Sequence, residues 1–176
     1  PVTGKRGDIC SGAGEAAQEA DFGVSDAHDV FDLHHSRHVI NWGKNLHVSN
    51  VHLLPILTEA RRRGATLTTV DPVRTRTATD SDRHVALRPG GDVTLALAVA
   101  RRLFASGRIA PDAATRCEGL EAFRDLAFAR PDADLLREAD VAAADADHLA
   151  DALADGPTAI LVGWGLQRRA RGATPV

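Results

Sequence analysis

The stretch His38–Asn45, with the sequence HVINWGKN, indicates the fold of this chain. Its apolar run stops abruptly at a glycine-containing turn, and a polar segment and a helical pattern follow, as is typical of a buried strand in an α/β sheet. In an open α/β sheet a ligand binds beyond the carboxyl end of such a strand, and phosphates favour the helix start that follows. From spacing alone, Trp42–Asn45 fits a ligand contact and an ordinary strand-to-loop turn equally well.

The same order of strand, sharp stop and polar or glycine residues recurs along the chain. We predict further strands at Thr66–Val70, His84–Leu87 and Ala159–Val162. Helical patterns lie between them, including one at Val51–Arg63 for which Asn50 is the expected cap. This alternation predicts an α/β fold with a doubly wound, mostly parallel Rossmann-like sheet.

Composition and length fit one α/β domain over residues 1–176, since 44% of the residues are hydrophobic and can form a core. Residues 111–155 are rich in alanine and are predicted to form a helical subregion packed at one side of the sheet. We expect breaks in this subregion at Gly119, at Pro131 and near Asp145.

The formal net charge of -3 gives no general attraction to nucleic acid or to an anionic membrane. The sequence has no apolar run of the roughly 18–20 residues needed to span a membrane, and no signal-peptide pattern. Because the chain opens at Pro1 rather than at a methionine and stops at Val176 just after a glycine turn, we expect a fragment of a larger protein. The compartment, cytoplasmic or periplasmic, therefore stays open.

Two acids follow predicted strands. Asp71 ends the second strand, where an acid commonly accepts hydrogen bonds from a ribose or a base, and Pro72 and Arg74 follow it. Asp92 follows the Pro89–Gly91 turn and stands at the start of a predicted helix. The ordinary alternative is that each acid caps a turn or a helix, which for Asp92 is a strong alternative. No GxGxxG follows the first strand, which argues against a nicotinamide dinucleotide site.

The cysteines and histidines offer candidate metal ligands. Cys10 precedes a turn of small residues, where a thiolate can ligate a soft or redox metal, although packing is the usual role of a lone cysteine. Cys117 lies in a helical pattern, and we expect it to pack. We interpret His34, His35 and His38 as solvated surface residues, because no third ligand follows at zinc spacing.

Five short strings, taken in order, resemble the molybdopterin oxidoreductases of the dimethyl sulfoxide reductase family. They are Ile9–Gly14 with Phe22–Gly23 after it, Trp42–Asn45, Asp71–Thr75, Arg88–Asp92 and Gly163–Gln167. Their order and spacing fit that family along nearly the whole chain. The chain departs from the family pattern at Leu46, where a proline is common, and at Val73, where an arginine is usual.

The resemblance implies a Mo-bis(molybdopterin guanine dinucleotide) cofactor, with tungsten as the metal in some members. Cys10 matches the position of the protein ligand to the metal, so the resemblance implies that it is the catalytic and metal-ligating residue. The remaining matched residues are implied to bind the cofactor: Trp42, Gly43, Lys44, Asn45, Asp71, Pro72, Arg74, Thr75, Gly90, Gly91, Asp92, Gly163, Trp164, Gly165 and Gln167.

The implied function is two-electron or oxygen-atom transfer to or from a small-molecule substrate by the larger enzyme. Family members are several times longer, so the resemblance also implies an iron–sulfur cluster in the missing N-terminal region of the parent and an electron-transfer partner or subunit. We expect no nucleic-acid or membrane contact from this segment, and no activity from the fragment alone. A non-catalytic nucleotide-binding or scaffold homologue is the alternative, and a nicotinamide-dependent dehydrogenase domain is the least favoured.

Overall fold

Four parallel strands form the sheet of this protein. The computed structural model describes residues 12–25 and 29–166. Strands β1 (His38–Trp42), β2 (Thr66–Val70), β3 (Arg83–Val85) and β4 (Thr158–Val162) lie in the order β3-β2-β1-β4. Trp42 at the end of β1 pairs in register with the last residues of both β2 and β4, so three strands end at one edge. The predicted parallel α/β sheet is confirmed.

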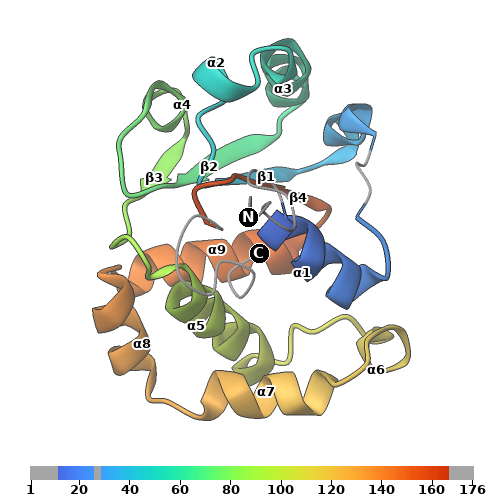
Figure 1. Ribbon diagram of the computed structural model, residues 1–176, viewed down its shortest axis with the longest axis vertical. Helices are drawn as coiled ribbons and strands as arrows, with labels where there is room; N and C mark the ends of the chain where they lie inside the picture. The colour runs from blue at the N-terminus through green and yellow to red at the C-terminus, as the bar shows by residue number, and fades with distance from the viewer. Residues whose placement is uncertain (1–11, 26–28, 167–176) are drawn as a thin grey trace, which may run out of the picture.

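Helices cover both faces of this sheet (Figure 1). One face carries the 3-10 helix η1 (Val30–His35) and the helices α2 (Leu46–Ser49), α3 (Leu53–Arg62) and α4 (Arg76–Thr79). The other face carries α5 (Asp92–Ala105) and α9 (Ala143–Asp155). The sheet is therefore doubly wound, as the sequence predicts.

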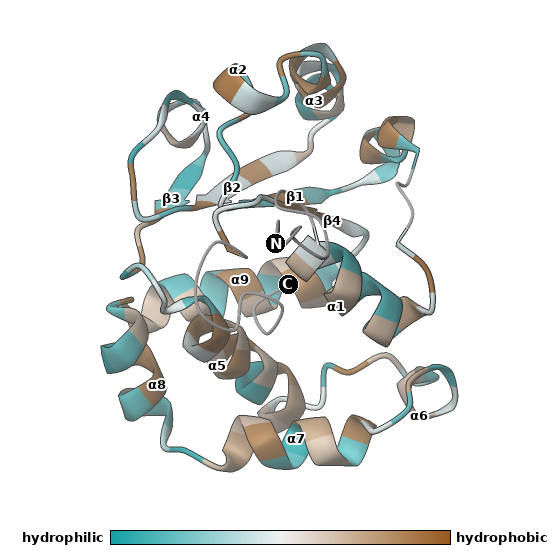
Figure 2. Ribbon diagram, viewed as in Figure 1, coloured by the Kyte–Doolittle hydropathy of each residue, from teal (hydrophilic) through white to brown (hydrophobic). Residues whose placement is uncertain are grey.

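Each face has its own apolar core, because successive residues of a strand point to opposite sides. Val39 of β1 joins a cluster with Leu46, Leu53, Leu57 and Leu67. The next residue, Ile40, joins the larger cluster on the other face, which includes Val70, Val85, Leu95, Val99, Leu149 and Ala150. Figure 2 shows apolar segments in the strands and in α5.

The alanine-rich subregion lies on the α5 side of the sheet, partly against the sheet itself and partly as a second helical layer (Figure 1). It contains α6 (Ala113–Arg116), α7 (Leu120–Phe128), α8 (Asp132–Ala139) and α9. Of these, α7 and α8 pack on α5 rather than on the sheet. A further helix, α1 (Gly12–Phe22), precedes the sheet in the chain. No helix within the described ranges is long and apolar enough to cross a membrane.

The three predicted breaks in this subregion are confirmed, the third of them a few residues before Asp145. Gly119 and Pro131 occupy the N-cap positions of α7 and α8. The third break, predicted near Asp145, lies between Asp140 and Ala142, and Asp145 itself is in the first turn of α9, where it forms an ion pair with Arg83. Asp140 ends α8 in a left-handed conformation with φ of 59°.

Two predicted boundaries need correction. The third strand is Arg83–Val85, and Leu87 lies beyond it, because β2 ends after Val70 and offers no further residues for pairing. Asn50 does not cap α3. It ends the short helix α2, and α3 begins only at Leu53.

Arg102 joins three helices in the layer beneath the sheet. From α5 it donates hydrogen bonds to Asp132 of α8 and to Asp147 of α9, at 2.5 Å each. Its side chain is only 15% exposed. Burial disfavours the guanidinium charge, but the hydrogen bonds to the two carboxylates outweigh that effect and raise the pKa of Arg102 above its ordinary value.

We predict that Arg102→Met lowers the free energy of unfolding by about 1–2 kcal/mol, because two shielded ion pairs are lost together. Equilibrium urea denaturation measures the change. Arg124→Met is the matched control, since Arg124 forms one exposed ion pair with Glu121 within α7, and we expect it to cost less than about 0.5 kcal/mol. Equal losses in the two variants would contradict the role of Arg102.

Candidate functional site

Two adjoining cavities open where the strands end. The first, of about 340 Å³, is named the acidic cavity and is lined by Gly43, Asp71, Pro72, Leu87, Pro89, Gly90, Asp92, Gly165 and Leu166. The second, of about 460 Å³, is named the lysine cavity and is lined by Gly43, Lys44, Asn45, Ser49, Asn50, Gly163, Trp164 and Gly165. Gly43 and Gly165 line both, so one continuous surface follows the strand ends.

The turns after β1 and β4 pack backbone against backbone between these cavities. The Gly163 amide donates to the Trp42 carbonyl at 2.7 Å, and the Gly43 amide donates to the Val70 carbonyl at 2.8 Å. A Cβ atom on Gly163 would lie 2.0 Å from the Gly43 carbonyl oxygen. Gly43 itself has φ of 67°, a left-handed conformation that favours glycine. These positions therefore require glycine for a structural reason.

Lys44 supplies positive charge to the lysine cavity. Its side chain is half-buried, and burial lowers the pKa of its ammonium group below the ordinary value. Within residues 12–25 and 29–166 it forms no ion pair. A half-buried cation without a carboxylate partner favours an anionic ligand, because such a ligand would replace the lost hydration.

Asp71 lies at the end of β2, where the sequence predicts it, and lines the acidic cavity. Its carboxylate Oδ1 accepts a hydrogen bond from the Val73 amide at 2.8 Å, so it caps the turn after the strand. Oδ1 of Asp71 is thus occupied by a hydrogen bond within the turn. The second oxygen has no hydrogen bond to the described residues and remains an acceptor for a ligand.

Asp92 is not the N-cap of α5, so the ordinary alternative to a ligand-binding role is wrong for this residue. Gly91 holds that position, because its carbonyl accepts the first helical hydrogen bond from Leu95 at 2.9 Å, and Asp92 is the first residue of α5. Asp92 is 6% exposed, and its carboxylate accepts a hydrogen bond from Trp42 Nε1 at 2.9 Å. It still lines the acidic cavity.

Trp42 differs from its neighbours in the turn, because it lines neither cavity. Its ring packs against the core on the α5 side, and its indole N–H holds Asp92 across the sheet edge. Trp42 therefore acts on the site indirectly, by holding the carboxylate of Asp92, which lies 50 residues further along the chain.

The other predicted residues lie around this edge in different ways. Arg74 is exposed in the loop after β2. Thr75 caps α4, where its hydroxyl accepts from the Ala78 amide at 3.2 Å. Trp164 is 53% exposed and lines the lysine cavity. Cys10 and Gln167 lie outside the described residues.

The remaining candidates for metal binding are not gathered in one place. Cys117 is exposed at the end of α6, so the expectation that it packs is wrong. His35 is exposed, as expected, but His38 is not a free surface residue. Its ring contacts Thr66 at 2.8 Å and Asp155 at 3.1 Å, at the opposite end of the strands from the cavities. No group of three potential ligands occurs in the described part of the chain.

Asn41 is the residue that sequence reasoning missed. It is fully buried in β1, and its amide nitrogen donates to the Lys44 carbonyl at 2.7 Å and to the Thr69 hydroxyl at 3.3 Å. It therefore fixes the backbone of the turn that carries Lys44. The available signal was a polar amide inside an otherwise apolar strand, since a buried polar group needs partners.

Comparisons with known proteins agree on one family. Residues 3–175 match the family model described as molybdopterin oxidoreductase. The chain is 34% identical over 172 residues, 97% of its length, to "Probable oxidoreductase YyaE" of Bacillus subtilis (strain 168), of which it covers 26%. It is 37% identical over 135 residues, 74% of its length, to the assimilatory nitrate reductase of Haloferax mediterranei, of which it covers 18%.

The fold also matches a solved structure. Acetylene hydratase from Pelobacter acetylenicus superposes with a TM-score of 0.77 over 92% of this chain, with 21% sequence identity. The match covers 22% of that protein. The chain thus spans about a quarter of the length of the first of these relatives, and less of the other two.

We predict that Gly163→Ala lowers the free energy of unfolding by about 1–3 kcal/mol, because its Cβ would overlap a backbone carbonyl that cannot turn aside. Urea denaturation measures this loss. The control is Gly165→Ala, whose Cβ would lie 3.2 Å from the same oxygen and needs only a small adjustment. A Gly163 variant as stable as the Gly165 variant would show that the two turns are not in close contact.

Proposed function

The chain belongs to the molybdopterin oxidoreductase family, and on that premise we propose that it is the dinucleotide-binding part of a larger molybdenum or tungsten enzyme. In this proposal residues 1–176 form one α/β domain of the parent. The cofactor is Mo-bis(molybdopterin guanine dinucleotide), of which this domain holds one dinucleotide. The parent also carries an iron–sulfur cluster and passes electrons to or from a partner.

The observation that carries the proposal is Lys44, which lines the lysine cavity next to the acidic cavity and forms no ion pair with the described residues. A guanine dinucleotide has an anionic pyrophosphate and a base and ribose rich in N–H and O–H donors. Lys44 fits the pyrophosphate, and the Asp71 oxygen that has no hydrogen bond to the described residues fits the base or ribose donors. Because Gly43 and Gly165 line both cavities, one extended ligand can contact both groups.

In this proposal the residues of the chain bind and orient the cofactor. Lys44 offsets pyrophosphate charge, and the glycine turns let the ligand approach the backbone closely. Asp71 and Asp92 accept hydrogen bonds from guanosine, and Trp42 keeps the Asp92 carboxylate aimed at the cavity. Cys10 is the protein ligand to the metal. When bound, the cofactor supplies two-electron or oxygen-atom transfer chemistry.

We predict that Lys44→Met weakens GDP binding to the 176-residue chain about tenfold, the effect of losing one charged hydrogen bond. Isothermal titration calorimetry gives the dissociation constants. Arg124→Met is the control for a general loss of positive charge, since Arg124 lies on α7, away from both cavities, and its binding constant should match the wild type. No binding of GDP by the wild-type chain would refute the proposed site.

We also predict that Cys10→Ala abolishes turnover of the parent enzyme while most of the cofactor stays bound, because the dinucleotide contacts remain. Elemental analysis for molybdenum and tungsten, together with release and quantification of the nucleotide, separates the two effects. Unchanged activity in this variant would refute the role of Cys10, and Cys117→Ala is the matched control, expected to behave as the wild type.

A further inference from the structure

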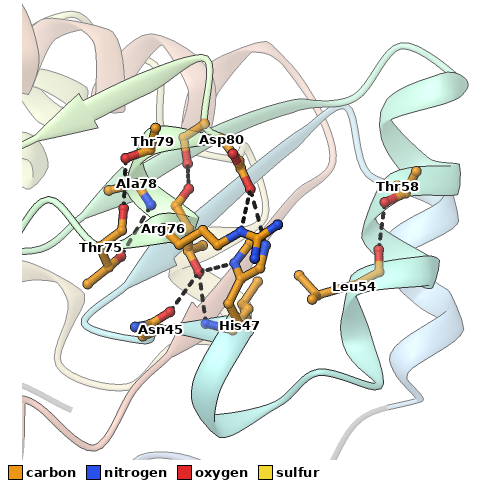
Figure 3. Close-up of polar contacts among 12 residues, drawn as sticks. Asn45, His47, Leu54, Thr58, Thr75, Arg76, Ala78, Thr79 and Asp80 are labelled. Carbon is orange, nitrogen blue, oxygen red and sulfur yellow. Dashed lines mark hydrogen bonds and ion pairs between the residues drawn. The ribbon is translucent and has the colours of Figure 1, made fainter.

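A hydrogen-bond network includes Asn45, which also lines the lysine cavity, and Figure 3 shows part of this network. Its centre is the hydroxyl of Thr77, which is 1% exposed. Three groups contact this one oxygen: the Leu46 amide at 2.9 Å, Asn45 Oδ1 at 3.2 Å and His47 Nδ1 at 3.1 Å. The other ring nitrogen of His47 lies 3.1 Å from Asp80 Oδ2.

The Thr77 hydroxyl has a single proton, so it can donate to only one of these groups. The Leu46 amide is always a donor and takes one lone pair of the oxygen. If the hydroxyl donates to Asn45 Oδ1, His47 must donate from Nδ1. Its contact with the Asp80 carboxylate then requires a proton on Nε2 as well. When the Thr77 hydroxyl donates to Asn45 Oδ1, all of these contacts are therefore hydrogen bonds only if both ring nitrogens of His47 carry a proton.

A neutral His47 reverses the arrangement. With its one proton on Nε2 facing Asp80, Nδ1 becomes an acceptor and takes the Thr77 proton. Asn45 Oδ1 then faces an oxygen lone pair, which is unfavourable. Rotating the Asn45 amide by half a turn restores a hydrogen bond, because its NH2 group then donates to Thr77. Each protonation state of His47 thus favours one orientation of Asn45.

We propose that His47 and Thr77 are positioning residues for Asn45, and that a proton on His47 decides which end of the Asn45 amide faces the lysine cavity. With His47 protonated, Asn45 presents N–H donors beside Lys44, which suits phosphate oxygens. With His47 neutral, it presents its carbonyl oxygen, which repels them. This link to phosphate binding rests on the proposed function, whereas the coupling of His47 to Asn45 does not.

The charged groups around His47 come from two other helices. Asp80, at the end of α4, contacts the ring directly and is also 3.9 Å from Arg76. Arg61 of α3 lines a surface cavity together with His47, Thr77 and Asp80, and it forms an ion pair with Asp82 at 2.7 Å. The His47 side chain is 17% exposed, so it exchanges protons with solvent while its contacts stay largely shielded.

Nuclear magnetic resonance tests the coupling without any nucleotide. We expect the side-chain amide signals of Asn45 to shift with pH in step with the signals of the His47 ring. The shared transition should disappear in Thr77→Val and return in Thr77→Ser. Thr68→Val is the matched control, since Thr68 is equally buried but bonds His148 on the opposite face of the sheet. A pH-independent Asn45 amide, or an unchanged transition in Thr77→Val, would overturn the proposal.

Binding of inorganic pyrophosphate tests the consequence. We expect the ratio of wild-type affinity to His47→Gln affinity to rise about tenfold from pH 8 to pH 5.5, which corresponds to one hydrogen bond to an anion. A ratio that stays constant over this range overturns the proposed effect of His47 on the cavity. If neither pyrophosphate nor GDP binds at any pH, the proposed nucleotide site fails, while a coupling seen by magnetic resonance still stands.

Discussion

The contact between the Gly43 and Gly163 turns is the constraint on which the site depends. It holds the ends of β1 and β4 so close together that a side chain on Gly163 would overlap the Gly43 carbonyl. Gly43 lines both cavities and is followed directly by Lys44, so the same contact sets where the charge of the site lies. The junction of β1 with the edge strand β4 therefore forms the wall that the two cavities share.

Charge is divided unevenly along this wall. The lysine cavity holds a cation whose pKa is lowered by burial, and the described residues supply it with no counter-ion. The acidic cavity is lined by two carboxylates, and one oxygen of each accepts a hydrogen bond within the protein. Asp71 accepts from the Val73 amide, and Asp92 accepts from the Trp42 indole. Hydrogen bonds within the protein therefore orient the Asp71 and Asp92 carboxylates, whereas the Lys44 ammonium group has no carboxylate partner among the described residues. Such an arrangement suits a ligand with an anionic middle and a polar, donor-rich end.

The sequence was sufficient for the plan of the fold, because strand patterns, glycine stops and helical spacing are local signals. It placed β1, β2 and β4 correctly and brought Lys44, Asp71 and Asp92 to one edge. It did not predict the tie between Trp42 and Asp92, since nothing local links two residues 50 positions apart. The exact residue at which α8 ends, Asp140, also depends on a left-handed backbone conformation that composition does not encode.

The late position of β4 has a consequence for how the site is assembled. His38 of β1 contacts Asp155, which lies just before β4 and 117 residues further along the chain. The whole helical subregion therefore lies, in sequence, between the turn after β1 and the turn after β4, which together form the shared wall of the cavities. During synthesis Lys44 and Asp71 emerge long before Gly163, and this long-range pairing forms slowly because a large loop must first close. A ligand that needs both halves binds only the finished sheet. By mass action, such a ligand also strengthens the attachment of the last strand.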